Sequence, residues 1–249
     1  MTDHTGSVVL SDAKVEARPA LEIDNLSSGY GTTQVLRNVS FVAFAGQVTA
    51  LLGSNGAGKS TLLNTAAGLI RPTEGSVKMY GKDVSSLRPY RRAKLGLCHV
   101  PEGRAIFRSL TVRENIALQS SKGKESEAVQ LVVEAFPALK NRLTQQAGTM
   151  SGGQQQMLAV ARAYVQNPKL ILVDEPSFGL APIVVDEIFE FLERMTNRGA
   201  ALVIVDQFVS QALQMATKAY VLRRGEMAYA GPARDLLGDN LFEQYFSPQ

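Results

Sequence analysis

Residues 48–61 read Val48-Thr49-Ala50-Leu51-Leu52-Gly53-Ser54-Asn55-Gly56-Ala57-Gly58-Lys59-Ser60-Thr61, and they give the clearest indication of the fold. Its first five residues are almost wholly apolar, as expected of a short parallel strand buried on both faces. The glycine-rich part matches the phosphate-binding pattern G-x-x-x-x-G-K-[ST], a P-loop, and residues 59–69 after it are predicted to form a helix. A buried strand, a glycine loop and a helix in this order predict an α/β nucleotide-binding core.

The residue types of the P-loop have different chemical tasks. The glycines allow successive backbone N–H groups to point at a phosphate, and the following helix adds the positive end of its dipole. Lys59 can reach the β- and γ-phosphates, and the Ser60 hydroxyl can ligate Mg²⁺. The predicted nucleotide-binding residues of the loop are Gly53, Ser54, Asn55, Gly56, Ala57, Gly58, Lys59, Ser60 and Thr61.

A pair of carboxylates follows a second apolar run, Leu170-Ile171-Leu172-Val173. The run predicts another buried strand, and open α/β sheets place their ligand sites at the carboxyl ends of strands. Asp174 at that end can hold Mg²⁺, and Glu175 can orient or deprotonate a water that attacks the γ-phosphate. Taken alone, these residues are typical of an ordinary strand that ends in an acidic turn. Together with the P-loop upstream, they indicate hydrolysis of a nucleoside triphosphate.

A second serine-glycine turn, Ser151-Gly152-Gly153-Gln154, precedes a predicted helix at 154–166. By itself such a turn is a helix N-cap. The turn could also bind an anion, so the chain has two candidate phosphate-binding turns, although the P-loop predicts only one bound nucleotide.

The composition is that of an ordinary globular protein. Of the 249 residues, 45% are hydrophobic and 20% are charged, which excludes general disorder. Basic residues number 26 against 23 acidic ones, too even a balance to indicate nucleic-acid binding. The single cysteine, Cys98, excludes a disulfide framework and a Cys-rich metal site and is expected to lie in the core of a reduced cytosolic protein. No apolar stretch approaches the roughly 20 residues that span a bilayer, and residues 1–20 are expected to be a flexible tail.

Hydrophobic periodicity predicts the remaining elements. Alternation over residues 21–26 predicts a half-buried edge strand, followed by a turn at 27–31. Strands are also predicted at 77–80, 95–100 and 200–205, with a terminal hairpin at 219–222 and 227–230. Helices are predicted at 125–136, 182–197 and 209–216, and a capping box at Thr111 begins another. The stretch from about 103 to 165 contains no predicted strand, which indicates a small helical subdomain.

The P-loop, Ser-Gly-Gly-Gln and Asp-Glu-Pro, in this order and spacing, closely resemble the motifs of ABC transporter ATP-binding subunits over about residues 20–246. The resemblance implies an α/β fold, a P-loop NTPase core with an N-terminal antiparallel β subdomain and a helical subdomain, in an ATP-binding domain over 21–249. It also implies ATP and Mg²⁺ as ligands. In that family two chains associate head to tail, and the signature of one chain, here Ser151, Gly152, Gly153 and Gln154, closes on the ATP of the other. Tyr30 matches the aromatic residue that stacks on adenine, although a tyrosine packed at a strand end would give the same pattern.

Two positions depart from the family's general pattern. The loop after the strand at 95–100 usually begins Pro-Gln, whereas this chain has Pro101-Glu102. Glu102 can still accept metal or water contacts, so the resemblance implies Ser60, Asp174 and Glu102 as metal ligands. The family's switch histidine falls at Gln207, which can donate a hydrogen bond to phosphate but cannot relay protons. The implied catalytic residues are Glu175, Lys59, Gln207 and Glu102, with Glu175 as general base.

The departures resemble one branch of the family, which contains the second ATPase of branched-chain amino-acid uptake systems. This likeness rests on four features: Pro101-Glu102-Gly103-Arg104, Ala147-Gly148-Thr149-Met150-Ser151-Gly152-Gly153, Gly179-Leu180-Ala181-Pro182 and the glutamine at the switch. It implies an ATPase that energises import, bound peripherally to permease subunits at the cytoplasmic face of the membrane. A second ATP-binding subunit, either a copy or a paralogue, and indirectly an extracellular binding protein would be its partners, with no nucleic acid. A related urea or amide importer and a soluble ABC ATPase outside transport remain alternatives.

Overall fold

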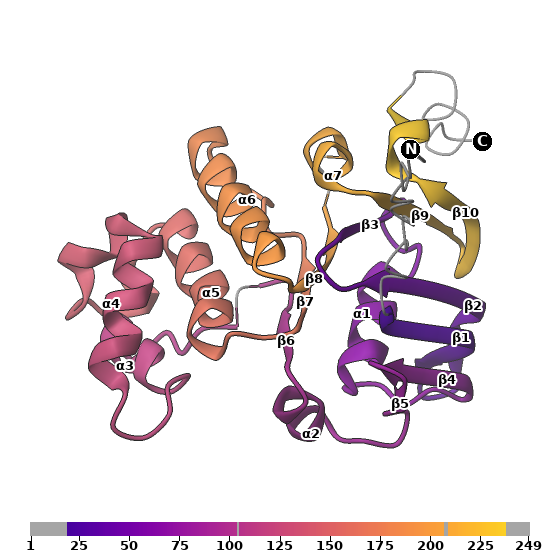
Figure 1. Ribbon diagram of the computed structural model, residues 1–249, viewed down its shortest axis with the longest axis horizontal. Coiled ribbons are helices and arrows are strands. Elements are labelled where there is room, and N and C mark those ends of the chain that lie inside the picture. The colour runs from indigo at the N-terminus through magenta and orange to yellow at the C-terminus, as the bar shows by residue number, and fades with distance from the viewer. Residues whose placement is uncertain (1–18, 104, 207–208, 238–249) are drawn as a thin grey trace, which may run out of the picture.

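The computed structural model describes residues 19–103, 105–206 and 209–237. Its strands form two sheets, one in the order β2-β1-β4-β5 and one in the order β10-β9-β3-β8-β7-β6 (Figure 1). The first consists of β1 (Pro19–Tyr30), β2 (Thr33–Phe44), β4 (Glu74–Met79) and β5 (Lys82–Asp83). The second consists of β3 (Val48–Leu52), β6 (Leu97–Val100), β7 (Leu170–Asp174), β8 (Ala201–Val205), β9 (Lys218–Arg223) and β10 (Glu226–Pro232).

The first sheet is antiparallel, and β1 lies inside it. Because β1 pairs with both β2 and β4, the prediction of an edge strand at 21–26 is wrong. Alternation shows that one face of a strand is buried; it does not show whether both of its edges are hydrogen-bonded. The turn predicted at 27–31 is also wrong over most of its length, because β1 continues past an irregularity at Asn25 (φ 46°) to Tyr30. β1 begins at Pro19, within the stretch predicted as a tail, and residues 1–18 lie outside the described ranges.

Within the six-stranded sheet, β3 and β7 are buried on both faces, as predicted for the runs at 48–52 and 170–173. β9, β3, β8, β7 and β6 run parallel, and β10 pairs antiparallel with β9. Along β7, Leu170 and Leu172 pack into one core, and Ile171 and Val173 pack into the other. The first core joins the two sheets and encloses the helix α1 (Lys59–Ala67). The P-loop helix is therefore held between two sheets.

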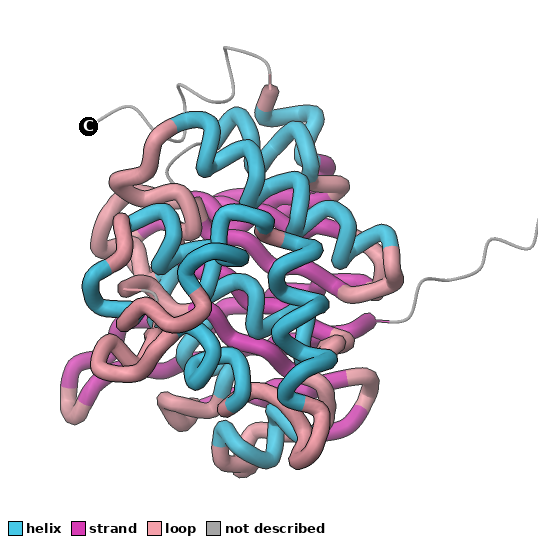
Figure 2. Tube along the Cα trace, turned by 90° about the vertical axis from the view of Figure 1, so that its left-hand side faces the viewer, coloured by secondary structure: helices cyan, strands magenta, loops and turns pink. Residues whose placement is uncertain are grey.

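Helices lie on the other side of the six-stranded sheet, as Figure 2 shows from their side. They are α3 (Val112–Ala117), α4 (Glu125–Ala135), α5 (Gly152–Gln166), α6 (Pro182–Asn197) and α7 (Val209–Met215), with the short helices η1 (Pro137–Arg142), η2 (Ala147–Thr149) and η3 (Ala233–Leu236). The predicted helices at 125–136 and 182–197 and the capping box at Thr111 are confirmed. A further helix, α2 (Pro89–Lys94), was not predicted.

Cys98 lies in β6 and is 3% exposed, as predicted for a core residue. Burial raises the pKa of its thiol to about 11, so the thiol stays neutral at physiological pH. None of the helices in the described part of the chain is long and apolar enough to cross a membrane.

Candidate nucleotide-binding site

The P-loop connects the carboxyl end of β3 to α1. Gly58, just before the helix, has φ 106°, and a Cβ there would lie 2.8 Å from Leu36 Cδ2. Both the backbone conformation and the space therefore require glycine. The Lys59 side chain folds back over the loop, where its Nζ donates to Gly53 O at 2.9 Å and to Ser54 O at 3.1 Å. These bonds hold the ammonium over the loop that would cradle phosphates.

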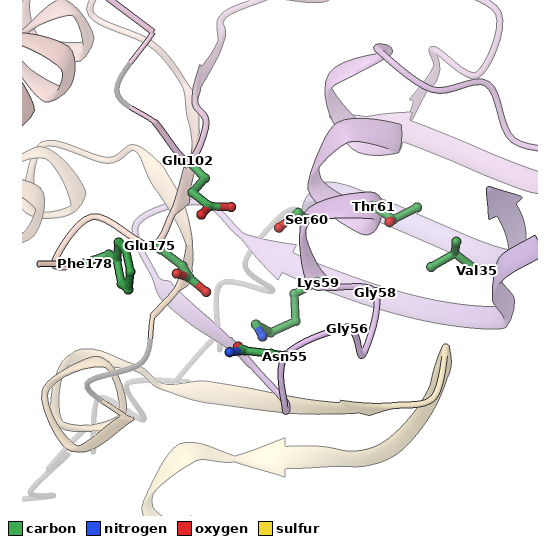
Figure 3. Close-up of a pocket in the computed structure, with 10 residues that line it drawn as sticks. All are labelled: Val35, Asn55, Gly56, Gly58, Lys59, Ser60, Thr61, Glu102, Glu175 and Phe178. Carbon is green, nitrogen blue, oxygen red and sulfur yellow. The ribbon is translucent and has the colours of Figure 1, made fainter. Parts of the chain in front are cut away.

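Carboxylates at the ends of β6 and β7 form the facing wall of the site. Asp174 ends β7 and is 3% exposed. Glu175 follows with φ 48°, an uncommon value for a residue other than glycine, and its N–H donates to Val205 O at 2.7 Å. In Figure 3 the Glu102 and Glu175 side chains lie across the cavity from Ser60 and Lys59.

A cavity of about 500 Å³ lies between these walls. The predicted site residues that line it are Asn55, Gly56, Gly58, Lys59, Ser60, Thr61, Glu102 and Glu175. Asp174 is linked to the lining through a hydrogen bond with the Ser60 side chain. Tyr30, at the end of β1, is 54% exposed and does not line the cavity. Gln207 lies outside the described residues.

Two lining residues, Val35 and Phe178, were not predicted. Val35 belongs to β2 and reaches the cavity only because β2 packs against the P-loop, a contact for which the sequence carries no signal. Phe178 is 57% exposed and lies beside Glu175 in Figure 3. Phe178 could have been predicted as a site residue, because a large apolar side chain in the turn just after Asp174-Glu175 is unusual.

Burial is the main influence on both carboxylates of the Asp-Glu pair. It raises the pKa of Asp174; the charge of Glu102 acts in the same direction, and the Ser60 hydrogen bond and the Lys59 charge act against it. Burial also raises the pKa of Glu175, with a further contribution from Glu102. The carboxylates of Glu102, Asp174 and Glu175 are thus grouped in a partly buried region that faces the ammonium of Lys59.

The donors present fit Mg²⁺. Asp174 Oδ1 is buried and has no hydrogen-bond partner within the described ranges. Such an oxygen beside a serine hydroxyl suits a hard cation. No group of three or more His, Cys, Asp or Glu placed to hold a metal occurs in the part of the chain that the structure describes. Mg²⁺ commonly takes one or two carboxylates together with waters and substrate phosphates, and Ser60, Asp174 and Glu102 match that smaller set.

Asp206, which follows β8, is hydrogen-bonded to the loop that carries Glu175. Its carboxylate accepts hydrogen bonds from the N–H of Ser177, at 3.2 Å, and from the Ser177 hydroxyl. Because Ser177 follows Glu175 by two residues, this pair fixes the turn from which the Glu175 side chain projects.

The signature turn begins α5 and does not line the cavity of its own chain. Its capping box is complete: the Gln154 N–H donates to Ser151 Oγ at 3.3 Å, and the Ser151 N–H donates to Gln154 Oε1 at 3.2 Å. A Cβ at Gly153 would lie 2.8 Å from Val184 Cγ1, so the approach of α6 requires a small residue there. Within one chain, the P-loop and the signature turn therefore do not form a common site.

Sequence comparison gives relatives for this chain. Residues 36–178 match the family described as ABC transporter. The high-affinity branched-chain amino acid transport ATP-binding protein BraG of Pseudomonas aeruginosa is 44% identical over 83% of this chain and 90% of its own. The probable branched-chain amino acid transport ATP-binding protein LivF of Archaeoglobus fulgidus is 34% identical, over 88% and 94%. The lipopolysaccharide export system ATP-binding protein LptB of Haemophilus influenzae is 32% identical, over 91% and 96%.

Solved structures of ATP-binding cassettes share the fold. The ADP conformation of the cassette MJ1267 has a TM-score of 0.77 at 26% identity, covering 92% of this chain and 99% of that one. The dimeric post-hydrolysis state of the cassette MJ0796, bound to ADP and Pi, has a TM-score of 0.77 at 25% identity, covering 86% and 99%. With its fold, its P-loop and these relatives, the chain belongs to the ATP-hydrolysing, ATP-binding subunits of ABC transporters.

Proposed function

We propose that the chain hydrolyses ATP to drive the import of branched-chain amino acids. The observation that carries the proposal is the cavity in which Lys59 and Ser60 face Glu102 and Glu175. Hydrolysis of a nucleoside triphosphate needs a cationic cradle for the phosphates and a carboxylate that addresses the attacking water. The 44% identity to BraG supports branched-chain amino acids as the cargo.

Each residue has a task in this proposal. The P-loop N–H groups and Lys59 bind the phosphates, and Ser60, Asp174 and Glu102 hold Mg²⁺, which when bound neutralises phosphate charge. Glu175 accepts the proton of the attacking water, and its raised pKa, caused mainly by burial, makes it a stronger base than an exposed glutamate. Tyr30 stacks on adenine, and Gln207 donates a hydrogen bond to phosphate.

The signature turn supports a two-chain assembly. Because the turn does not line its own chain's cavity and Ser151 is exposed, we propose that the start of α5 binds the ATP of another chain. MJ0796, a structural relative, is a dimer in its post-hydrolysis state. We therefore propose head-to-tail pairing with a second ATP-binding subunit, either a copy or a paralogue.

A second cavity, of about 370 Å³, is proposed as part of the surface that receives a membrane permease. Leu69 and Tyr90, which line it, are 59% and 53% exposed. Neighbouring exposed apolar side chains mark protein contacts. Such docking would hold the chain at the cytoplasmic face of the membrane, where an extracellular binding protein serves it only through the permease.

Site-directed crosslinking tests the docking surface. Single cysteines replace Phe107 or Ser109, which follow the lining residue Ala105 in the chain, and a control cysteine replaces the exposed Glu226 of β10, a strand that lies at the opposite end of the molecule from α3 (Figure 1). We expect crosslinks to a co-purified permease from the first two positions only. Labelling confined to Glu226→Cys would contradict the assignment.

Transport by the reconstituted complex tests the cargo. Vesicles that contain the permease, the binding protein and this ATPase are expected to accumulate leucine, isoleucine and valine when ATP is supplied. Uptake of urea or a short amide instead would support the related importer. Release of lipopolysaccharide would support export, which the 32% identity to LptB keeps as a second candidate. Full ATPase activity with no permease partner in the cell would favour a soluble ABC ATPase.

A further inference from the structure

The turn of the β9–β10 hairpin lies against the nucleotide site, although it is far from the P-loop in sequence. Arg223 pairs with Glu226, so the turn consists of Arg224 and Gly225. Their φ angles are 50° and 82°, the positive values at both central positions that a type I′ turn requires. The hairpin is anchored through β9, which runs parallel to β3, the strand that leads into the P-loop.

Gly225 joins two neighbouring elements through its own backbone. Its N–H donates to Ala57 O in the P-loop at 3.0 Å, and its carbonyl accepts from the Arg37 N–H of β2 at 2.8 Å. The Arg37 side chain also donates to Arg224 O at 3.1 Å through Nη1. One residue of the hairpin is thus bonded to the P-loop and to β2 at the same time.

The approach leaves no space for a side chain at Gly225. A Cβ there would lie 1.9 Å from Val35 O and 3.0 Å from Val35 C, both backbone atoms that cannot rotate away. Val35 lines the nucleotide cavity, and Ala57 lies between Gly56 and Gly58, which also line it. A change at position 225 must therefore move the β2 wall of the cavity, the P-loop, or both.

We infer that Gly225 is a positioning residue of the nucleotide site, which sets the spacing between the P-loop and the β2 wall. Gly225 does not line the cavity and acts through Ala57 and Val35. The inference deepens the proposed function, on which it rests, because it assigns to the distant hairpin a share of the affinity for nucleotide.

The chain provides a matched control in its other tight hairpin. Met79 of β4 pairs with Lys82 of β5, so Tyr80 and Gly81 form the turn, with φ angles of 49° and 77°. A Cβ at Gly81 would have no heavy atom within 4 Å. Gly81→Ala therefore introduces the same backbone strain as Gly225→Ala, but without the collision.

The experiment is a titration of the full-length wild-type, Gly225→Ala and Gly81→Ala proteins with a non-hydrolysable ATP analogue, at a temperature where circular dichroism shows all three folded. We expect Gly81→Ala to bind with the wild-type Kd and Gly225→Ala to bind at least about fivefold to tenfold more weakly, the ratio that corresponds to one net hydrogen bond or slightly more. Equal Kd values for the two variants would overturn the inference. A wild-type protein that does not bind the analogue would overturn the proposed function and this inference with it.

Hydrogen exchange on the wild-type protein decides the question even where Gly225→Ala does not fold. Phosphate bound in the P-loop stabilises the loop, so the amide hydrogens of Arg37 and Gly225 should exchange several-fold more slowly with the analogue present. The turn at Tyr80 and Gly81 should exchange at an unchanged rate. Equal exchange of the Gly225 turn with and without bound analogue would overturn the inference.

Discussion

Arg92 is a buried cation that supports the P-loop helix from its far end. It lies in α2 and is 0% exposed. Its Nη1 donates to Thr65 O at 2.8 Å and to Ala66 O at 2.7 Å, in the last turn of α1. Its Nε and Nη2 each donate at 3.1 Å, to Leu87 O and to Ser85 O. Burial lowers the pKa of Arg92 to about 10, so the guanidinium remains charged at neutral pH, where it favours the negative end of the helix dipole.

The size of the effect of Arg92→Met follows from these four bonds. Hydrogen bonds from a charged donor contribute about 1.5–3 kcal/mol each, but dehydration of the buried guanidinium offsets a large part of the sum. Methionine fills a similar volume and leaves four carbonyls without this donor. We therefore expect the free energy of unfolding to fall by about 3–5 kcal/mol, because buried carbonyls that lose their donor cost about 1–3 kcal/mol each and the relief of dehydration offsets part of the sum. Arg92→Lys keeps the charge but not the planar fork, so its loss should be smaller, about 1–3 kcal/mol.

Urea unfolding monitored by circular dichroism measures these losses. The matched control is Arg91→Met, one residue earlier, where an exposed arginine donates to the Tyr90 hydroxyl at 3.1 Å and lies over the Tyr90 ring. That variant should stay within about 0.5 kcal/mol of the wild type. If Arg92→Met were no less stable than Arg91→Met, the four hydrogen bonds would not support α1, and the reasoning would be refuted.

Three further predictions concern the nucleotide site and its surroundings. Lys59→Ala should abolish binding of a non-hydrolysable ATP analogue in a calorimetric titration, because the ammonium is the chief side-chain charge on the phosphates, and unchanged affinity would remove the P-loop assignment. Glu175→Gln should lower steady-state ATPase turnover by about 10²–10⁴-fold, while ATP binding survives and the two-chain form accumulates. Gln207→Ala should lower turnover less than Glu175→Gln does. If Glu175→Gln hydrolysed ATP at the wild-type rate, Glu102 would become the next candidate base. Burial and the nearby charge of Arg162 lower the pKa of His99 to about 4, below its usual 6.5. As the pH falls, His99 is therefore protonated in the unfolded chain before it is protonated in the folded chain. The free energy of unfolding should fall by up to about 3 kcal/mol between pH 6.5 and pH 4. His99→Gln should remove that part of the pH dependence, and identical urea-unfolding profiles of the two proteins between these pH values would contradict the assignment.

Local sequence patterns were sufficient for the elements that carry the chemistry. The strand at 48–52 and the helix at 182–197 have the predicted bounds, because each is defined by a continuous apolar run or a helical stripe between clear stop signals. The P-loop and the Asp-Glu pair could be read in the same way, since a phosphate cradle needs its residue types at fixed spacing along one segment. Residue types and their spacing thus predicted the type of site and the reaction class.

The distant segments that complete the site could be identified only from the folded chain. Neither the internal position of β1 in its sheet nor the contact of Val35 with the cavity follows from periodicity, because both depend on pairing between strands. Gly225 looks like an ordinary turn glycine in the sequence, and Arg92 like one more residue of an exposed basic stretch. Their roles appear only where the hairpin meets the P-loop and where α2 meets the end of α1, because a backbone contact between segments far apart in the chain leaves no pattern in either segment alone.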